Sequence, residues 1–263
     1  MQPKIIVFGN EKGGTGKSTL AMHLAIFLLQ QKKQVGLIDI DARQGTVSRY
    51  CMNRRSYQAH LPQPLCLAIH SNHITRISDH NEELSITNDN IPTAEQLVQY
   101  ALSQMQHCDF IIIDTPGNDT ELSRIAHTYA DILLTPVNES MIDIDLLAQN
   151  NAGQLTPSIY AEMVWKQRMI RASQRKAPIQ WFVVRNRMTS LQSNNRQEVL
   201  KVLQELSKRL SFSLCEGFFE RVVFRELFNA GLTIIDHHQP TKNLSHIAAK
   251  KEIQQLAQEM MLI

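Results

Sequence analysis

The chain of 263 residues contains 43% hydrophobic and 20% charged side chains, the composition of an ordinary globular protein. No apolar run approaches the ~18 residues that a membrane-spanning helix needs, which argues against an integral membrane protein. The first predicted strand starts at residue 4 and leaves no room for a signal peptide, so we expect a cytoplasmic protein. Without internal repeats or a clear linker, residues 1–263 are expected to form one domain.

The net charge of +2 is unevenly distributed along the chain. Residues 1–150 hold 11 Lys and Arg against 16 Asp and Glu, whereas residues 151–263 hold 16 against 9. A basic C-terminal half suggests a polyanionic partner, DNA first and an acidic membrane surface second. A solvated charged face that binds nothing is the alternative.

The cysteines are scattered along the chain without a C-x-x-C pair, which indicates reduced, mostly packing thiols rather than a disulfide or metal framework. They are Cys51, Cys66, Cys108 and Cys215.

The first predicted elements are a buried strand over residues 4–8 and a helix over residues 18–31, joined by a glycine-rich loop. Its glycines let backbone N–H groups approach phosphate oxygens, and the helix N-terminus adds partial positive charge. Lys17 can reach the β- and γ-phosphates, and the Ser18 hydroxyl can complete a Mg²⁺ shell. The predicted nucleotide-binding residues of this loop are Gly13, Gly14, Thr15, Gly16, Lys17, Ser18 and Thr19.

The loop departs from the standard phosphate-binding pattern in two places. Glu11 stands where the first glycine is usual, and Lys12 adds a second lysine ahead of the Gly-Gly pair. This is the deviant Walker A form with its signature lysine. Two lysines in a merely solvated basic loop are the alternative, but strand, glycines, Lys-Ser and helix all coincide here.

A second predicted strand over residues 34–38 ends in two carboxylates. Ligands of open α/β sheets bind at the carboxyl ends of the strands, so both should lie near the phosphates. We assign Asp39 as an indirect Mg²⁺ partner and Asp41 as the residue that orients the attacking water. Either could instead cap the helix predicted over residues 44–55.

Residues 56–92 are the least informative stretch, with a short strand at 66–69 and a loop or irregular helix over 71–90. A helix is predicted over 93–107, followed by an apolar strand over 109–113.

That strand runs into Asp114-Thr115-Pro116-Gly117. Four apolar residues ending in Asp describe a Walker B strand, whose carboxylate holds Mg²⁺ through water. Residues 115–119 would form a switch segment that senses the γ-phosphate, and simple turn chemistry is the alternative.

The C-terminal half continues the alternation of strands and helices. Asn186 follows the strand over 180–184, where its amide can pair with an adenine edge or serve as a turn residue. The last helix carries one apolar stripe and few flanking lysines, so we expect it to pack against the sheet rather than lie on a membrane. The other predicted elements are strands at 132–135 and 233–235 and helices at 158–174, 195–210, 221–229 and 244–261. Together they predict an α/β P-loop NTPase fold, a mostly parallel twisted sheet with helices on both faces.

Three motifs together resemble the ParA/MinD family of deviant Walker A ATPases: residues 12–19 (KGGTGKST), 38–41 (IDID) and 113–117 (IDTPG). The likeness narrows to the MipZ branch and covers nearly the whole chain except residues 56–92. The segments that resemble this branch are residues 10–11 (NE), 41–44 (DARQ), 135–140 (TPVNES), 142–143 (ID), 181–187 (WFVVRNR) and 221–228 (RVVFRELF).

The resemblance implies a weak, Mg²⁺-dependent ATPase that forms a face-to-face homodimer with ATP. In such a dimer Lys12 would reach the partner's nucleotide, with Gly13 and Gly14 at the interface. The implied catalytic residues are Lys12, Lys17 and Asp41; the metal residues are Ser18, Asp39 and Asp114; the switch residues are Asp41, Arg43, Thr115, Pro116 and Gly117; and Asn186 matches the adenine position.

The resemblance also implies that the dimer binds DNA without sequence preference, associates with the nucleoid, binds the partition protein ParB and inhibits FtsZ polymerisation to position the division site. The run at 194–198 is less basic than such a DNA surface suggests, and Asn118 stands where a second glycine is usual. The candidate DNA contacts are Arg196, Lys201, Lys208, Arg221, Arg225 and Lys250.

Other readings of the same P-loop are a ParA-type chromosome or plasmid partition ATPase, a membrane-cycling MinD, and a metabolic enzyme such as a nitrogenase-like reductase or an amide synthetase. The reductase needs interface cysteines for an iron–sulfur cluster, and none of the four follows a switch segment.

Overall fold

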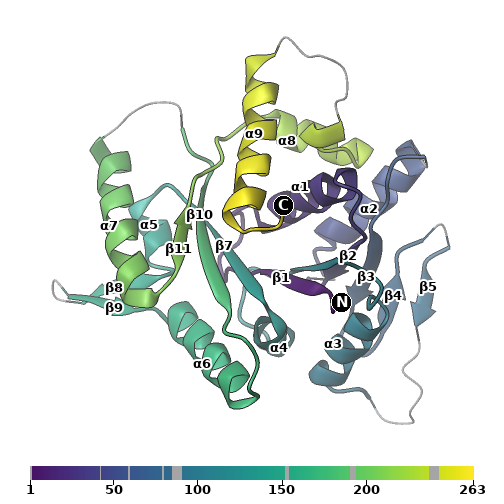
Figure 1. Ribbon diagram of the computed structural model, residues 1–263, viewed down its shortest axis with the longest axis horizontal. Helices are drawn as coiled ribbons and strands as arrows, with labels where there is room; N and C mark the ends of the chain where they lie inside the picture. Colours follow the sequence, from purple (N-terminus) through teal and green to yellow (C-terminus); the bar gives the residue numbers. More distant parts are fainter. Residues whose placement is uncertain are drawn as a thin grey trace.

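A mixed β-sheet of nine strands forms the centre of the described part of the computed structural model (Figure 1), with strand order β11-β10-β7-β1-β6-β2-β3-β4-β5. The structure describes residues 2–41, 43–58, 60–78, 80–84, 91–151, 154–189, 194–236 and 243–263. The strands are β1 (Lys4–Phe8), β2 (Val35–Asp39), β3 (Leu65–Ile69), β4 (Ile74–Arg76), β5 (Glu82–Leu84), β6 (Phe110–Asp114), β7 (Ile132–Asn138), β10 (Gln180–Asn186) and β11 (Ser213–Cys215). A separate hairpin pairs β8 (Ala148–Asn151) with β9 (Gln154–Pro157).

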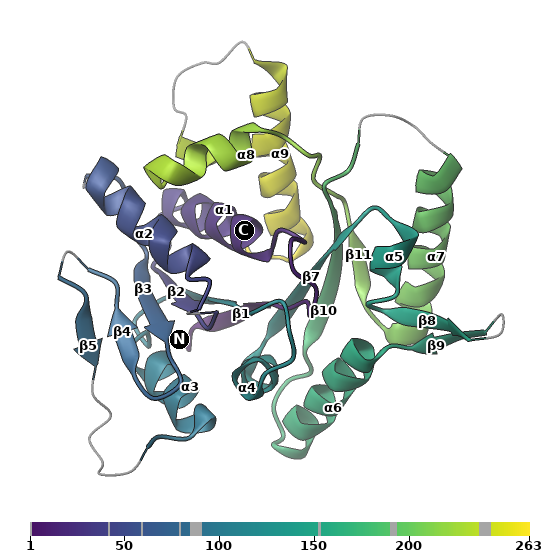
Figure 2. The ribbon, with the colours of Figure 1, turned by 180° about the vertical axis from the view of Figure 1, so that it is seen from behind.

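Helices cover both faces of the sheet, as the two opposite views show (Figures 1 and 2). The strands alternate their side chains between the two cores: Ile6 and Phe8 belong to one, and Val7 of the same strand to the other. One face carries α1 (Lys17–Gln30), α2 (Thr46–Tyr57), α8 (Val223–Glu226) and α9 (Leu244–Glu259); the other carries α3 (Ala94–Ser103), α4 (Glu121–Tyr129), α6 (Ile159–Ser173) and α7 (Asn194–Leu210), and α5 (Met141–Ile144) follows β7. The predicted sheet with helices on both faces is confirmed.

The last helix packs against the sheet, as predicted. Ile253, Leu256, Ala257 and Met260 are at most 2% exposed and belong to the same core as α1. No helix among the described residues is both long and apolar enough to cross a membrane. The cysteines are also as predicted, because all four are free and buried.

Several predicted elements were wrong. Residues 74–76 and 82–84 form the antiparallel edge strands β4 and β5, not a loop or helix, because β3 offers β4 an edge to pair with; residues 79 and 85–90 of that predicted loop lie outside the described residues. The predicted strand at 233–235 is a 3₁₀ turn, η2 (Ile234–Asp236), because the Asp236 carboxylate accepts hydrogen bonds from the backbone N–H and hydroxyl of Thr233 at 2.7 and 2.9 Å. The helix predicted at 221–229 is only α8 followed by a 3₁₀ turn, η1 (Leu227–Ala230).

The β7 strand also continues past Pro136, where we predicted its end, because β10 pairs with it as far as Asn138. The sequence patterns missed α4, α5, the β8–β9 hairpin and β11 altogether.

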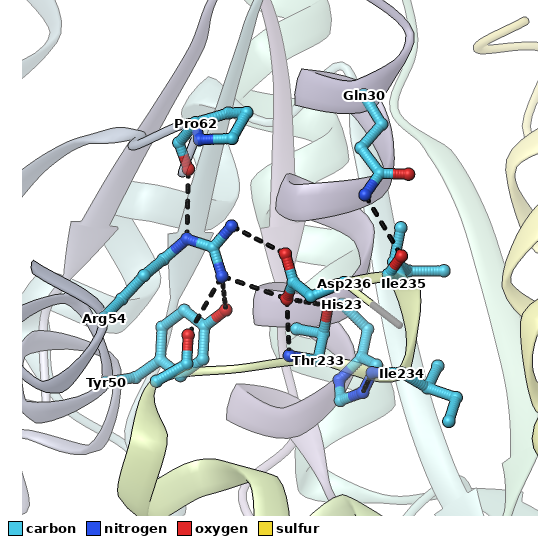
Figure 3. A network of polar contacts seen from close by, with 10 residues as sticks. His23, Gln30, Tyr50, Arg54, Pro62, Thr233, Ile234, Ile235 and Asp236 are labelled. Carbon is cyan, nitrogen blue, oxygen red and sulfur yellow. Dashed lines mark hydrogen bonds and ion pairs between the residues drawn. The ribbon is translucent and has the colours of Figure 1, made fainter. Parts of the chain in front are cut away.

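A buried ion pair joins α2 to the C-terminal 3₁₀ turn (Figure 3). The Arg54 guanidinium is fully buried and donates to both Asp236 carboxylate oxygens, at 2.8 and 3.0 Å. It also donates to the carbonyl oxygens of Pro62 and Gly231, both at 3.0 Å, and to the Tyr50 hydroxyl at 3.4 Å, so the buried charge is paired with a carboxylate and surrounded by polar acceptors. Gly231 has φ +61°, and a Cβ there would meet the Arg54 backbone at 2.0 Å, so only glycine fits. This network fixes the helix that follows the predicted catalytic Asp41.

His23 of α1 lies beside this network and is buried in its neutral form. Its Nδ1 lies 2.7 Å from the Thr19 carbonyl oxygen and donates to it, while its Nε2 accepts from the Ile234 N–H at 3.4 Å. Burial lowers the pKa of His23 to about 4. The unfolded chain therefore binds a proton on this residue near pH 6.5 and the folded chain only near pH 4, so this contribution to stability is lost as the pH falls.

We therefore expect the free-energy advantage of the wild type over His23→Gln to shrink by about 2 kcal/mol between pH 7 and pH 5. Urea unfolding at the two pH values measures this difference. The matched control is His107→Gln, the same substitution at an exposed histidine. A pH-independent gap for His23→Gln would contradict a neutral buried imidazole.

Candidate nucleotide site

The register of the parallel strands brings the predicted functional loops to one end of the sheet. Phe8, the last residue of β1, pairs with Asp114 of β6, which in turn pairs with Asp39 of β2. The glycine loop, both carboxylates and the switch segment therefore follow adjacent strands at their carboxyl ends, where α/β proteins bind ligands.

The conformation of the glycine loop is held by its own polar contacts. Gly16 precedes α1 with φ +88°, a conformation that side chains rarely adopt. Asn10 braces the loop, because its amide donates to the Pro136 carbonyl at 2.5 Å and its oxygen accepts from the Lys12 N–H at 2.6 Å. Asn10 was part of the resemblance but had no predicted role; its place directly after the first strand was the available signal.

A cavity of about 660 Å³ opens above this loop, large enough for a nucleotide phosphate chain. It brings together most of the predicted nucleotide and switch residues. The lining residues are Gly13, Gly14, Gly16, Lys17, Ser18, Thr19, Asp41, Arg43, Gln44, Thr46, Thr115, Gly117, Asn118 and Arg187. Thr15 and Pro116 are buried beside it and are not among the lining residues.

Lys17 is only 6% exposed and its Nζ donates to the Lys12 carbonyl at 3.1 Å, within the loop itself. Burial lowers its pKa, while the carboxylates of Asp114 and Asp41 act in the opposite direction. Lys17 lines the cavity, where a bound phosphate would compensate its charge for the water that burial has removed.

The Ser18–Asp114 pair fits a magnesium ion. The Ser18 hydroxyl donates to Asp114 Oδ2 at 2.6 Å, whereas Asp114 Oδ1 is buried without a hydrogen-bond partner. Burial, and then the charge of Asp39, raises the pKa of Asp114 to about 8. Hard oxygen donors with an unused buried lone pair are the ligands that Mg²⁺ takes directly or through water.

The two carboxylates after β2 have different surroundings. Asp39 is fully buried and accepts from the Ser48 N–H and hydroxyl at 2.9 and 2.8 Å, which holds the first turn of α2. Neither carboxylate is the N-cap of α2, because that position is Gly45 and no side chain caps it. Burial raises its pKa. Asp41 instead lines the cavity, and its carboxylate accepts only a weak 3.5 Å contact from the Gln44 N–H.

The switch segment lies directly on the glycine loop. The Thr115 hydroxyl donates to the Phe8 carbonyl at 2.8 Å, which fixes the start of the segment. A Cβ at Gly117 would lie 2.9 Å from the backbone of Gly13, so a side chain there would push the two segments apart. A phosphate that changes the position of the glycine loop would therefore also move the switch segment.

Asn186 borders a smaller cavity of about 60 Å³ beside the glycine loop. Its amide donates to the Thr15 carbonyl at 2.7 Å, so in this structure it braces the loop. The same cavity is lined by His23, Phe219 and Phe224, aromatic surfaces on which a base can stack.

Lys12 differs from Lys17 in its exposure, its position relative to the cavity and its charged partner. The Lys12 side chain is 41% exposed and does not line the main cavity, and its ammonium forms an ion pair with Asp143 of α5. The Asp143 carboxylate is itself oriented by the Ser140 hydroxyl, which donates to it at 2.8 Å. Asp143 had no role assigned to it from the sequence, since only folding brings it to Lys12. The flanking Met141 and Ile142 are 41% and 73% exposed.

The six candidate DNA contacts lie on or next to α7, α8 and α9. Both arginines at positions 196 and 221 form ion pairs with described residues: Arg196 Nε lies 3.2 Å from Glu139, and Arg221 donates to both carboxylate oxygens of Glu252 at 2.6 Å. Lys201, Lys208 and Arg225 are exposed, and Lys250 is half-buried.

A parallel sheet with a deviant glycine loop, a Walker B aspartate beside Ser18 and a facing switch segment define a P-loop nucleotide-binding protein of the ParA/MinD type. Comparison of the chain with known protein families and solved structures narrows this class. A model of the family described as ATPase MipZ matches residues 4–263, and the chain belongs to that family.

Solved structures share the fold at low sequence identity. An ATP complex of a variant of Cyanothece McdA is 16% identical, covering 99% of this chain and 97% of that chain, with a TM-score of 0.64. A plasmid partition protein of Borrelia burgdorferi bound to AMPPNP is 18% identical over 98% and 100% of the two chains, with a TM-score of 0.60. The MinC:MinD complex of Aquifex aeolicus gives 17% identity over 99% and 96%, with a TM-score of 0.56. No curated protein sequence gave a significant match.

Proposed function

We propose that this chain is a weak, Mg²⁺-dependent ATPase that works as a dimerisation switch. With ATP, two copies associate face to face across their glycine loops, and the dimer binds DNA without sequence preference. The protein binds ParB, inhibits FtsZ polymerisation, and so positions the division site from the nucleoid. A ParA-type partition ATPase that moves DNA is the alternative, and it predicts no effect on FtsZ.

The observation that carries the proposal is the different placement of the two loop lysines. Lys17 is buried in its own cavity, whereas Lys12 is half-exposed outside it, where a second copy can reach it. No atom of the described residues lies within 4 Å of a Cβ built on Gly13 or Gly14, so this side of the loop is open to a second copy. The exposed Met141 and Ile142 beside it add the apolar area that a protein contact uses.

In the proposed reaction the chain's own residues bind, orient and exclude water. The loop N–H groups and Lys17 hold the phosphates, and Asp41 orients the attacking water. Ser18 and Asp114 would hold Mg²⁺, which supplies charge neutralisation at the β- and γ-phosphates. Lys12 of the second copy adds positive charge where it develops in the transition state, so hydrolysis depends on dimerisation.

A DNA-binding assay and a polymerisation assay test the proposed partners. A filter-binding titration with a random-sequence duplex should show binding with ATP but not ADP, and the affinity should fall steeply as salt rises, because phosphate contacts release counterions. Light scattering of polymerising FtsZ, with and without the protein and ATP, separates the two candidate functions. Inhibition supports the division switch, and unchanged assembly in the presence of DNA binding favours the partition ATPase.

The Lys12–Asp143 ion pair competes, in this scheme, with the contact of Lys12 to a second copy. Asp143→Asn should therefore let the protein dimerise at about two- to five-fold lower ATP concentration, the effect of losing an ion pair with one partly exposed partner. Sedimentation velocity at increasing ATP measures the midpoint. Asp145→Asn is the matched control, since Asp145 is an exposed carboxylate two residues away. A midpoint that is unchanged or higher in Asp143→Asn would refute the competition.

A further inference from the structure

A second groove lies between α6 and the C-terminal end of α7. Its cavity of about 440 Å³ shares no lining residue with the nucleotide cavity. Trp181, on its floor, is at the amino-terminal end of β10, whereas Asn186 at the other end of that strand borders the nucleotide site. The groove therefore lies at the amino-terminal ends of the strands, at the opposite end of the sheet from the glycine loop.

The groove and the helix beside it present large apolar side chains to solvent. Trp165 is 60% exposed on α6, and Ile159 and Met169 of the same helix are 71% and 56% exposed. Trp165 and Met169 are four positions apart and share one face of the helix, whereas Ile159 lies about 120° round the helix from Trp165. Exposed tryptophan bordering a concave cavity is typical of a binding site, because it buries much area at little cost in conformational entropy.

The remaining lining residues give the groove a positive rim. Lys166 and Arg209 are exposed there. Among the described residues Arg209 forms one ion pair, at 2.7 Å, with Glu205, which is equally exposed. Glu162 is the one carboxylate that lines the cavity. In this first cavity three cations face one carboxylate, which favours an anionic occupant, and Glu259 adds a carboxylate where the groove continues.

The third cation, Arg168, is built into the wall. Its guanidinium lies 5.3 Å from the centre of the Trp181 ring and donates to the carbonyl oxygens of Leu210 and Ser211 at 3.2 and 2.9 Å. These acceptors are neutral, and no carboxylate among the described residues forms an ion pair with it. Burial lowers the pKa of Arg168. A partly desolvated cation without a counter-charge stabilises a carboxylate that enters the groove.

The groove continues past Arg168 into a second cavity of about 430 Å³ along β11, the edge strand of the sheet. Arg168, Trp181 and Ser211 line both cavities. The combined shape suits an extended chain rather than a compact small molecule.

We propose that this groove docks an acidic peptide segment of a partner protein that presents one aromatic or large aliphatic side chain between carboxylates. The apolar side chain inserts between Trp165 and Leu210. The flanking carboxylates pair with Lys166 and Arg209 at the rim and with Arg168 in the wall. Because the groove lies away from the nucleotide cavity, docking occurs with and without ATP, and its failure would leave the ATP switch untouched.

The two tryptophans of the chain, Trp165 and Trp181, both line the groove, so intrinsic fluorescence reports its occupancy directly. The full-length protein is titrated with a synthetic ten-residue peptide of Asp and Glu around one Phe. We expect a saturable change in fluorescence, at least about tenfold weaker for a peptide with Ala in place of Phe, and for one with Asn and Gln in place of the acids.

On the protein side, the double variant Lys166→Glu with Arg209→Glu should weaken binding about tenfold, because both rim charges are reversed. Lys251→Glu, an exposed lysine on α9, is the matched control and should bind as the wild type does. Trp165→Ala is the second variant, and far-UV circular dichroism verifies folding. The proposal is overturned by the absence of saturation at 1 mM peptide, by equal binding of the uncharged peptide, or by nucleotide-free sedimentation showing a dimer that Trp165→Ala abolishes.

Discussion

Replacing Asp41 by alanine is expected to stop ATP hydrolysis while leaving ATP binding intact. The Asp41 carboxylate lines the nucleotide cavity, and among the described residues it accepts one hydrogen bond, the weak 3.5 Å approach of the Gln44 N–H, so we expect the fold to tolerate its loss. Loss of the group that orients the attacking water should lower the turnover number at least about a hundredfold. The variant should therefore accumulate as an ATP-bound dimer. A coupled phosphate-release assay measures the rate, and fluorescent ATP analogue titration measures binding.

Asp39→Ala is the informative control, because both carboxylates follow the same strand. Asp39 is buried and holds the Ser48 N–H and hydroxyl, so its loss leaves those donors unpaired and should lower the melting temperature. Asp41→Ala should melt as the wild type does. Hydrolysis at the wild-type rate in Asp41→Ala would remove that residue from the mechanism.

Lys17→Ala is expected to weaken ATP binding strongly, whereas Lys12→Ala should bind ATP normally as a monomer and fail to dimerise. Lys17 is a buried ammonium in the cavity, and its removal deletes a charge-assisted contact to phosphate in a partly desolvated site, a loss of about 2 to 3 kcal/mol or 30- to 150-fold in affinity. Lys12 is half-exposed and bound to Asp143 outside the cavity. Isothermal titration calorimetry with the non-hydrolysable analogue AMPPNP gives both affinities.

The two variants serve as controls for each other, since each removes one lysine from the same loop. Equal loss of AMPPNP affinity in both would mean that Lys12 acts within its own subunit. Normal affinity in Lys17→Ala would contradict the site itself.

The sequence was sufficient for features encoded in contiguous residues. Strand, glycine loop and helix follow one another at the start of the chain, and the apolar run before Asp114 directly predicts a buried strand. The glycine loop and the Asp114 segment, which together form the phosphate site, could therefore both be predicted. Their meeting also followed from a general rule, because parallel strands align their carboxyl ends. The stripe of Ile253, Leu256 and Ala257 predicted the packing of α9 in the same way.

Features that depend on partners far along the chain could not be predicted. The strands β4 and β5 have three residues each and exist because β3 supplies an edge, so their local pattern carries little signal. In the sequence Asp143 resembles an ordinary residue at the start of a helix, and only the folded chain places it against Lys12. Likewise, nothing in the sequence indicated that Asn186 braces Thr15 or that Arg221 is occupied by Glu252.

The most direct test of the switch is sedimentation velocity of the purified protein with ADP, with ATP, and with ATP for Asp41→Ala and Lys12→Ala. The proposed switch predicts a monomer with ADP, a shift towards dimer with ATP that is complete in Asp41→Ala, and a monomer in every state for Lys12→Ala. A protein that is a dimer with ADP, or a Lys12→Ala variant that dimerises as the wild type does, would contradict it.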